Sequence, residues 1–317
     1  MVTDLIAAGS PLRAKDFQRH EAKIIDPLSI KLKSGWVYTT PPPTQGLASL
    51  IILGIFDRLN CAAPDGFNHV HSLVEATKHA FSIRDKYISD PDHMKKLPDH
   101  FLKNKFLDSL VKQINPKKSL PWPMPARNGD TVWVGAIDKE GCSISLIQSI
   151  YWEFGSGVTL PQTGIVWQNR GTSFSLNSES PNFLTPGKKP FHTIHPAMAL
   201  LNDGRLLVYG TMGGEGQPQT QAALFTRYVE FSQSLQKAIA APRWLLGRTW
   251  GDATAKLRLE NRFEPSVVSA LELAGHDIEI VRDFDEIMGH AGAVVRDQNG
   301  IFQGASDPRC DGAALAP

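Results

Sequence analysis

The sequence has few cysteines, no excess of charge of one sign and no long apolar run. Its 317 residues include only Cys61, Cys142 and Cys310, without a CxxC pair, which excludes a disulfide framework and suits a reducing compartment. The 33 basic and 32 acidic side chains give a net charge of +1, and this balance argues against a nucleic-acid or membrane-surface partner. No run of 18 apolar residues occurs, so no membrane span is expected.

The start of the chain lacks the features of a secretory signal. Residues 1–13 do not combine a basic start, a long apolar stretch and a small-residue cleavage site. We therefore expect a cytoplasmic protein, or a chain whose true N-terminus lies further upstream. A length of 317 residues, 42% of them hydrophobic, is enough to bury a large core.

Apolar patterns predict grouped strands and helices rather than a strict alternation. Strands are expected at residues 35–40, 131–137, 143–148, 164–167, 206–209, 277–282 and 291–296. Helices are expected at residues 47–59, 72–87, 101–114, 219–233, 235–240 and 266–274. A loose connector rich in proline leads from the third helix to Asp130. Grouping of this kind favours α+β layers over a doubly wound sheet.

Three short blocks suggest chemistry. Asp130-Thr131-Val132-Trp133 opens a strand, Tyr209-Gly210-Thr211-Met212-Gly213-Gly214 ends a strand in a glycine pair, and Gly304-Ala305-Ser306-Asp307-Pro308-Arg309 lies near the end of the chain. By itself, a Thr at a strand start is more often a β-branched strand former than a nucleophile. The three blocks in this order resemble the gamma-glutamyltransferase family of N-terminal-nucleophile hydrolases.

The resemblance covers nearly the whole chain and implies a fold. Other matching blocks lie at residues 38–46, 85–91, 138–141, 154–157, 186–190 and 241–243. The implied fold is α+β, a four-layer αββα sandwich that here lacks part of the large-subunit segment. Residues 1–130 would be the C-terminal part of that segment and residues 131–317 the small-subunit segment, together forming one structural domain.

Family members cut their own chain before a Thr, which here predicts cleavage between Asp130 and Thr131. The cut creates an α-amino group with a pKa of about 7.7–8.0, which can accept the hydroxyl proton. Attack on an amide builds an oxyanion, and backbone N–H groups at a glycine pair can stabilise it. The resemblance implies that Thr131 is the nucleophile, that Ser149 hydrogen-bonds it, and that Gly213 and Gly214 form the oxyanion hole. No cofactor or metal is expected.

The substrate end departs from the usual family pattern. Val132-Trp133 replaces Thr then His, Tyr151 replaces an Asn, and His192-Thr193 replaces a Ser-Ser pair. Ser173 stands where an acidic residue would hold the α-amino group of a glutamyl substrate. A hydroxyl cannot replace a carboxylate there without losing a charge-assisted bond. Glutathione is therefore not expected to be the best substrate.

The same departures are similar to a branch that holds oxamate amidohydrolases and gamma-glutamyltransferase-like cephalosporin acylases. Members of this branch hydrolyse amides whose acyl group ends in a carboxylate but carries no α-ammonium. Arg170 would offer such a carboxylate a bidentate fork, and the alternative is an ordinary surface Arg. The residues expected to bind substrate are Tyr151, Arg170, Ser173, His192 and Thr193.

Three functions stay open at this point. The first is an autoprocessed amidohydrolase acting on an oxamate- or glutaryl-like amide, the second a true gamma-glutamyltransferase or glutathione hydrolase, and the third a non-catalytic fragment or partner subunit. The expected partners are a small-molecule amide and either a heterodimer of the two cleavage products or a separate N-terminal segment.

Several polar residues outside these blocks have ordinary explanations. His69 and His71 lack a third metal ligand and are expected on a helix surface. His192 and His195 lie near an expected loop, where packing is the alternative to lining the substrate. Asp307 and Arg309 are expected to form a structural ion pair.

Overall fold

A computed structural model describes residues 1–122, 130–247 and 254–316. Its centre is a six-stranded sheet in the order β1-β2-β7-β8-β12-β13, with every neighbouring pair antiparallel. These strands are β1 (Leu28–Lys31), β2 (Gly35–Thr39), β7 (Ala197–Leu201), β8 (Leu206–Thr211), β12 (Ala291–Arg296) and β13 (Phe302–Ser306). Because β2 pairs with β7, the sheet combines strands from both sides of Thr131.

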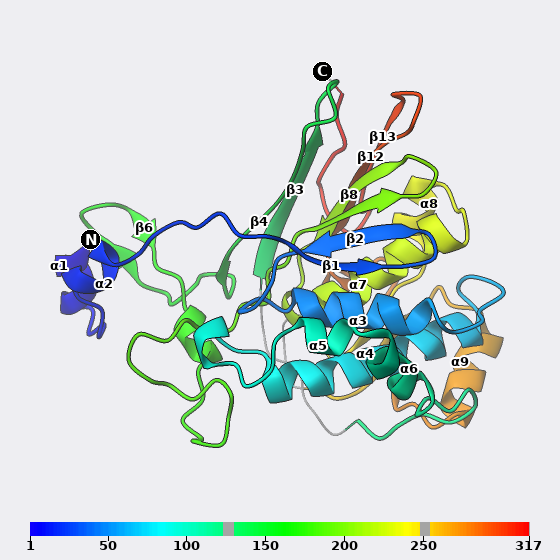
Figure 1. The fold of residues 1–317 in the computed structure, drawn as a ribbon, viewed down its shortest axis with the longest axis horizontal. Helices are drawn as coiled ribbons and strands as arrows, with labels where there is room; N and C mark the ends of the chain where they lie inside the picture. The colour runs from blue at the N-terminus through cyan, green and yellow to red at the C-terminus, as the bar shows by residue number, and fades with distance from the viewer. Residues whose placement is uncertain (123–129, 248–253, 317) are drawn as a thin grey trace.

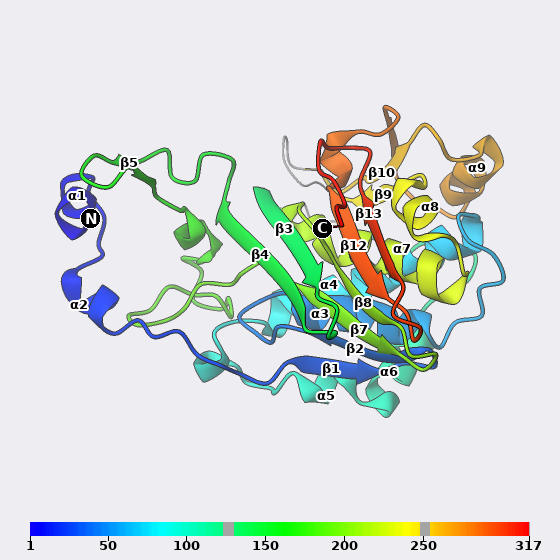
Figure 2. The ribbon, with the colours of Figure 1, turned by 90° about the horizontal axis from the view of Figure 1, so that it is seen from above.

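A two-stranded hairpin forms a second layer on this sheet. Strands β3 (Asp130–Ile137) and β4 (Ser143–Tyr151) lie alongside β8 and β12 (Figures 1 and 2). The Asp138 carboxylate accepts the backbone N–H of Cys142 and closes the turn between them. The outward face of the hairpin remains exposed and apolar, with Val132, Val134, Ile144 and Leu146 each more than half accessible.

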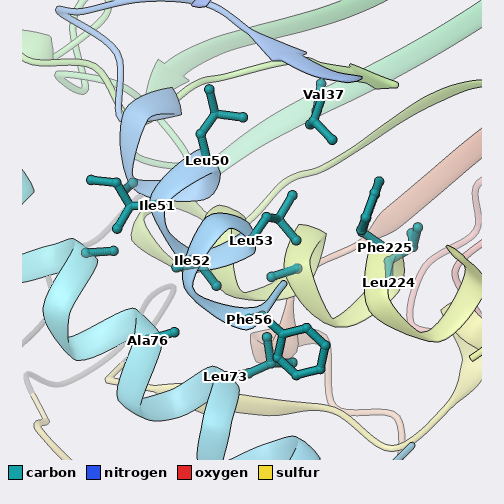
Figure 3. Packing of buried hydrophobic residues seen from close by; sticks show 14 of the residues in the cluster. Val37, Leu50, Ile51, Ile52, Leu53, Phe56, Leu73, Ala76, Leu224 and Phe225 are labelled. Carbon is teal, nitrogen blue, oxygen red and sulfur yellow. The ribbon is translucent and has the colours of Figure 1, made fainter. Parts of the chain in front are cut away.

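Helices cover the opposite face of the six-stranded sheet. Helix α3 (Gly46–Phe56) is buried along its whole length, because it is apolar on all sides and lies against β1, β2, α4 (Phe67–Tyr87) and α7 (Gln217–Phe225). Figure 3 shows its side chains filling the space between Val37 of the sheet, Leu73 of α4 and Leu224 of α7. In the described residues the fold therefore has three stacked layers, one of helices and two of strands.

The remaining elements surround these layers. The other α-helices are α1 (Val2–Ala7), α2 (Ala14–Gln18), α5 (Asp99–Leu102), α6 (Asn104–Val111), α8 (Leu235–Ala240) and α9 (Pro265–Leu273). Short 3-10 helices are η1 (Pro91–His93), η2 (Arg170–Ser173), η3 (Gly214–Gly216) and η5 (Glu286–Met288), and η4 (Thr226–Glu230) is a π-helix. The smaller sheets contain β5 (Thr159–Leu160) with β6 (Ile165–Val166), and β9 (Trp244–Leu246) with β10 (Leu257–Glu260) and β11 (Ile278–Val281). None of the described helices has both the length and the apolar composition of a membrane span.

The α+β class is confirmed, and most expected elements are present. The expected helix at residues 101–114 is instead two helices, because Lys103 between them is extended. Helix α4 begins at Phe67, five residues before the expected start. Part of the expected connector, residues 123–129, lies outside the described residues.

The expected surface position of His69 and His71 is wrong. Both rings are buried, because α4 is covered on several sides by α3, α7, α9 and the connector. His69 accepts the N–H of Asp65 at Nδ1 and bonds Thr226 Oγ1 through Nε2. Burial, followed by the charge of Arg227, lowers the pKa of His69 to about 3.

Candidate active site

Thr131 lies at an irregular point in the pairing of β3 with β4. The register shifts between Asp130 and Val132, so that Thr131 stands against two residues of the partner strand, Ser149 and Ile150. A bulge of this kind bends the strand and redirects a side chain, and such bulges are frequent beside active sites. The Thr131 side chain is half-buried, with Oγ1 shielded from solvent. The hairpin thus places Thr131 and Ser149 at neighbouring positions of two paired strands.

The Trp133 ring packs between β3 and the central sheet and determines how closely the two approach. Its indole ring lies on Gly210 and Gly292, which pair directly across β8 and β12. A Cβ on Gly210 would stand 2.1 Å from Trp133 Cδ1, and one on Gly292 would stand 2.5 Å from Cζ3. Trp133 Nε1 also donates to Ser145 Oγ at 3.0 Å. Only glycine at both sheet positions leaves room for the ring.

Contacts between the two sheets place Thr131 level with the end of β8. Trp133 lies over Gly210, while a Cβ on Gly135 would stand 3.2 Å from Val208 Cγ1, so β3 and β8 run in opposite directions. Alternate residues of a strand share one face. Thr131, two residues before Trp133, therefore faces the stretch beyond Gly210, where β8 ends and the glycine pair begins.

The glycine turn, Gly213-Gly214, has a backbone that other residues rarely adopt. Its φ angles are 124° and 50°, in the region that favours glycine. Thr211 Oγ1 donates to Met212 O at 2.6 Å, and the Gly216 N–H donates to Gly213 O at 2.8 Å. In a trans peptide the N–H points opposite to the preceding carbonyl. The N–H of each glycine therefore points away from the held carbonyl of its own peptide, and successive amides in a turn of this kind can bind an anion.

Gln45 ties the glycine turn to another part of the site. Its Nε2 donates to Gly214 O at 2.7 Å and to Thr193 O at 2.6 Å. Arg84 donates to Gln45 Oε1 at 3.2 Å and to Glu215 Oε2 at 3.1 Å. All these polar side chains are buried, so the turn is held by a fixed network.

Arg170 is a buried cation without an acidic partner among the described residues. Its guanidinium carbon stands 3.9 Å from the centroid of the Tyr151 ring, and Nη1 donates to Thr193 Oγ1 at 3.3 Å. Within the described parts of the chain, Arg170 Nη2, Ser173 Oγ and His192 Nδ1 are buried without a hydrogen-bond partner. Burial lowers the pKa of Arg170 to about 10. The alternative of a surface Arg is wrong, because Arg170 is only 2% exposed.

The residues around Arg170 are neutral or strained. Burial, followed by the charge of Arg170, lowers the pKa of His192 to about 4, so the ring carries no charge near pH 7. Tyr151 has a φ of 81°, a conformation that costs energy in a residue with a side chain and that occurs often at ligand-binding sites. Together these features leave the Arg170 charge beside an uncharged imidazole and a strained tyrosine.

The segments that carry the expected site residues contact one another in one continuous series. The start of β3, with Thr131, pairs with the end of β4, where Tyr151 lies against Arg170. Arg170 bonds Thr193, and Gln45 joins the Thr193 backbone to the glycine turn. His195, in contrast, donates to the Thr193 carbonyl and is fully buried. This position fits the alternative in which His195 packs in the interior and does not line the substrate site.

Sequence analysis assigned no role to Gln45 or Arg84. Gln45 stands between a proline run and an all-apolar helix, where a buried amide is unusual. This position in the sequence is the signal by which a role of Gln45 could have been predicted. Arg84 faces the same site from the last turns of α4, and its contacts depend on tertiary packing.

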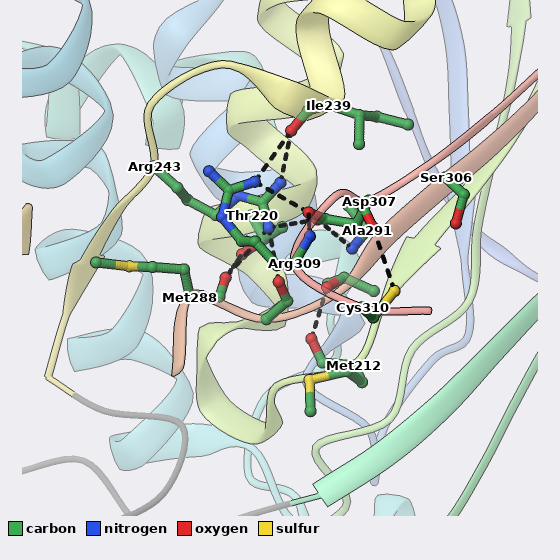
Figure 4. Close-up of polar contacts among 12 residues, drawn as sticks. Met212, Thr220, Ile239, Arg243, Met288, Ala291, Ser306, Asp307, Arg309 and Cys310 are labelled. Atoms are coloured by element: carbon green, nitrogen blue, oxygen red, sulfur yellow. Dashed lines mark hydrogen bonds and ion pairs between the residues drawn. The ribbon is translucent and has the colours of Figure 1, made fainter. Parts of the chain in front are cut away.

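Asp307 and Arg309 form the expected structural pair within a larger buried network (Figure 4). The Asp307 carboxylate accepts from Arg243 at 2.7 Å and from Arg309 at 3.0 Å. Arg309 also bonds both oxygens of Glu260 at 2.6 Å. Arg243 donates to the carbonyl of Gly289 at 2.7 Å, close to the end of β8. The network stabilises the backbone that supports the glycine turn.

Comparisons with known proteins show which relatives the chain has. The chain is 52% identical over 310 residues to the oxamate amidohydrolase proenzyme of Klebsiella pneumoniae subsp. pneumoniae, covering 98% of this chain and 59% of the relative. It is 39% identical over 317 residues to the glutathione hydrolase-like YwrD proenzyme of Bacillus subtilis, covering 99% of this chain and 60% of the relative. The chain thus spans about three fifths of the length of these relatives.

The fold is also similar to a solved structure. The crystal structure of cephalosporin acylase from Bacillus halodurans superposes with a TM-score of 0.88 at 32% identity, covering 98% of this chain and 56% of that one. The gamma-glutamyltranspeptidase family model matches residues 1–316. The chain therefore belongs to the gamma-glutamyltranspeptidase family.

Proposed function

We propose that this chain is an N-terminal-nucleophile amidohydrolase, matured by cleavage between Asp130 and Thr131. Its substrate is a small amide whose acyl group ends in a carboxylate without an α-ammonium, of the oxamate or glutaryl kind. The observation that carries the substrate class is Arg170, buried with an unpartnered Nη2 among the described residues. The 52% identity to an oxamate amidohydrolase proenzyme supports the same choice.

A substrate carboxylate would complete the Arg170 site. A buried cation without a counter-charge is costly, and a carboxylate accepts two parallel N–H bonds from a guanidinium. Ser173 is on the same 3-10 helix, three residues from Arg170, so both side chains lie on one side of it. A hydroxyl at that place favours an acyl group without an ammonium over a γ-glutamyl group.

Maturation uses the Thr131 hydroxyl on its own chain. Oγ attacks the Asp130 carbonyl carbon, the bond to the Thr131 nitrogen breaks, and the hydroxyl proton passes to that nitrogen. An ester on Oγ and a new α-amino group result. Water then hydrolyses the ester, which restores the hydroxyl and leaves a carboxylate on Asp130.

Hydrolysis of the substrate repeats this chemistry with the new amino group as base. The amine takes the Oγ proton, Oγ attacks the amide carbon, and the glycine-turn N–H groups stabilise the oxyanion. The amine next gives its proton to the leaving nitrogen, and water hydrolyses the Thr131 ester. Loss of one oxyanion donor typically costs about 2.7–4 kcal/mol of barrier.

The two cleavage products would remain together as a heterodimer. Strands β1 and β2 belong to residues 1–130, while their neighbour β7 belongs to residues 131–317. Strand β2 pairs with β7 over five residues, from Gly35 opposite Leu201 to Thr39 opposite Ala197. Separation would break this ladder and expose the core under α3.

Intact mass and N-terminal sequencing of the purified chain test maturation. We expect two polypeptides, residues 1–130 and 131–317, that elute together. Thr131→Ala should leave one uncut chain, and Thr131→Ser, which keeps a hydroxyl, should still be cut. A wild-type chain that stays whole would reject the proposal and favour a non-catalytic partner.

A specific observation supports that second candidate, a partner subunit. The outward face of the β3–β4 hairpin is apolar and exposed, and exposed patches of this kind mark interaction sites. A polypeptide related to the part of the relatives that this chain does not span would cover it. Under this alternative the purified chain stays uncut and inactive until such a segment is added.

A comparison of three substrates tests the acyl group. Oxamate, a glutaryl amide and a γ-glutamyl anilide should be offered to the matured protein at equal concentration. We expect hydrolysis of oxamate or the glutaryl amide to exceed that of the γ-glutamyl compound. Clear preference for the γ-glutamyl anilide would instead support a true gamma-glutamyltransferase or glutathione hydrolase.

A further inference from the structure

The connector that leads from α6 toward the cleavage point is held along α4. Its described part, residues 112–122, follows one side of that helix. The hydrogen bonds between them are His71 Nε2 to Asn115 O at 2.8 Å, Lys78 Nζ to Ser119 Oγ at 2.6 Å and to Leu120 O at 2.7 Å, and Leu120 N to Glu75 Oε2 at 2.9 Å. The Ser119 N–H also donates to Ala274 O at 2.7 Å, which fixes the connector from the other side.

The connector runs in the same direction as α4, toward the active site. Asn115 contacts His71, and seven residues later the Trp122 ring lies 6.3 Å from the ring of Phe81. From His71 to Phe81 the helix advances about 15 Å. One turn further, Arg84 bonds Gln45 and Glu215 at the glycine turn. The described part of the connector therefore ends beside Phe81, one turn of α4 before Arg84 and its contacts at the glycine turn.

The sequence of α4 explains how one helix serves both ends. His71, Glu75, Lys78, Phe81 and Arg84 follow one another at spacings of four and three residues. Adjacent members of this series are neighbours on the helix surface, and the series winds about half a turn round the helix between Glu75 and Arg84. We call these five residues the α4 stripe.

Hydrogen bonds account for every polar group of the stripe at its connector end. The carbonyl of Asn115 can only accept, so His71 Nε2 donates to it. His71 Nδ1 lies 2.8 Å from His276 Nε2, and His276 Nδ1 lies 3.3 Å from Ser119 Oγ. The Lys78 ammonium also forms an ion pair with Glu75 Oε1 at 2.8 Å.

These hydrogen bonds argue against a metal site at the buried cluster of His71, Glu75 and His276. In the described part of the chain, ligand atoms of His71, Glu75 and His276 lie within 4.8 Å of one another. Each of these atoms is already used in a hydrogen bond. A cation would also have to displace the Lys78 ammonium from Glu75. The cluster is a complete hydrogen-bonded clamp.

We propose that the α4 stripe, together with His276, positions the connector for self-cleavage, so that the Asp130–Thr131 bond reaches the glycine turn. The proposal rests on the self-cleavage proposed above. From Trp122 to Asp130 the chain can span at most about 29 Å, so fixing Trp122 limits where Asp130 can lie. After the cut the connector is a chain end and has no part in hydrolysis. The clamp therefore acts on maturation and not on turnover.

The test separates these two reactions. The double variant Glu75→Gln/Lys78→Met removes the bonds from Lys78 to the connector without leaving an unpaired buried charge. Thr77→Val is the matched control, because Thr77 is buried on α4 but donates only to Leu73 O of its own helix. A second variant, Trp122→Ala, weakens the same docking from the connector side. Intact mass follows cleavage with time, and turnover is measured per cleaved chain.

We expect the double variant to be cut about 10-fold to 100-fold more slowly than wild type, with turnover per cleaved chain within about twofold of wild type. Trp122→Ala should slow cleavage in the same direction, and Thr77→Val should not. Cleavage of both connector-directed variants at the wild-type rate overturns the clamp and leaves the proposed function intact. Equal losses of cleavage and of turnover per cleaved chain also overturn it, since they indicate general damage. A wild-type chain that is never cut overturns both proposals.

Discussion

Two parts of this molecule bury arginine in opposite ways. Arg243 and Arg309 share the carboxylates of Asp307 and Glu260, and backbone carbonyls take other N–H groups. Arg170 is equally buried but has a tyrosine ring and a hydroxyl in place of acids. In the first arrangement, acidic side chains of the protein balance the guanidinium charges, although Arg243 Nε is buried without a hydrogen-bond partner among the described residues. Under the proposed function a ligand supplies the missing negative charge in the second arrangement, and this difference would separate a structural cation from a binding cation.

The largest expected effect comes from breaking the network of Arg243 and Arg309 with Asp307. Asp307→Ala leaves two arginines facing each other in the interior, and removal of one partner of a buried pair costs about 3–5 kcal/mol. Urea unfolding followed by circular dichroism measures the change in the free energy of unfolding. Asp311→Ala, on the exposed C-terminal stretch, is the control and should change little. A loss below about 1 kcal/mol for Asp307→Ala would mean that the network is not structural.

Removal of Arg170 should have the opposite pattern. Arg170→Met leaves the free energy of unfolding unchanged or higher, because it removes an uncompensated charge. Hydrolysis of a carboxylate-bearing amide should fall about 100-fold in kcat/KM, equivalent to about 2.7 kcal/mol. Arg282→Met, at an exposed arginine, should leave both quantities unchanged. A strongly destabilised Arg170→Met protein would place Arg170 with the structural arginines.

Ser173→Asp should convert the second site toward the first. The new carboxylate would lie on the same side of the 3-10 helix as Arg170 and would pair with it. We expect hydrolysis of the glutaryl amide to fall about tenfold, with any remaining activity shifted toward the γ-glutamyl anilide. Ser173→Ala is the control, since it adds no charge. Unchanged relative rates for the two substrates would show that residue 173 does not select the acyl group.

The smallest effect concerns acid stability. The pKa of His192 is lowered to about 4 by burial and by Arg170, so the unfolded chain takes up its proton first, near its ordinary pKa of about 6.5. Stability from this group is therefore present above about pH 6.5 and is lost as pH falls toward 4.

Arg170→Met removes the second cause and should reduce this acid loss by up to about 1 kcal/mol. Urea unfolding of wild type and variant at pH 7 and pH 5 measures the difference. The buried rings of His69, His195 and His276 have lowered pKa values in both proteins, so their contribution cancels. An identical pH dependence in the two proteins would indicate that His192 does not sense Arg170.

Sequence patterns predicted the parts of the fold that depend on local chemistry. The helix at residues 235–240 and the strand at residues 291–296 occur with the expected bounds, because short apolar repeats and the flanking turns determine both. The glycine pair could be singled out because its conformation requires glycine. The expectation that the glycine pair acts together with Thr131 depended on the family resemblance and not on the spacing of the residues.

Tertiary packing explains what the sequence could not predict. His69 and His71 have the spacing of a helix surface, but α4 is covered on several sides and buries them. Gln45 contacts residues nearly 150 and 170 positions away, and no local pattern encodes such bonds. That no acid of the described residues pairs with Arg170 also becomes visible only when the folded neighbours of Arg170 are known.

The most direct measurement is the site of acylation during turnover. The matured protein is mixed with a glutaryl amide, quenched in acid and digested, and the peptides are weighed by mass spectrometry. We predict a glutaryl group on the peptide that begins at Thr131, with much less of it in Arg170→Met. An acyl group on another residue, or active protein whose chain is not cut before Thr131, would contradict this account.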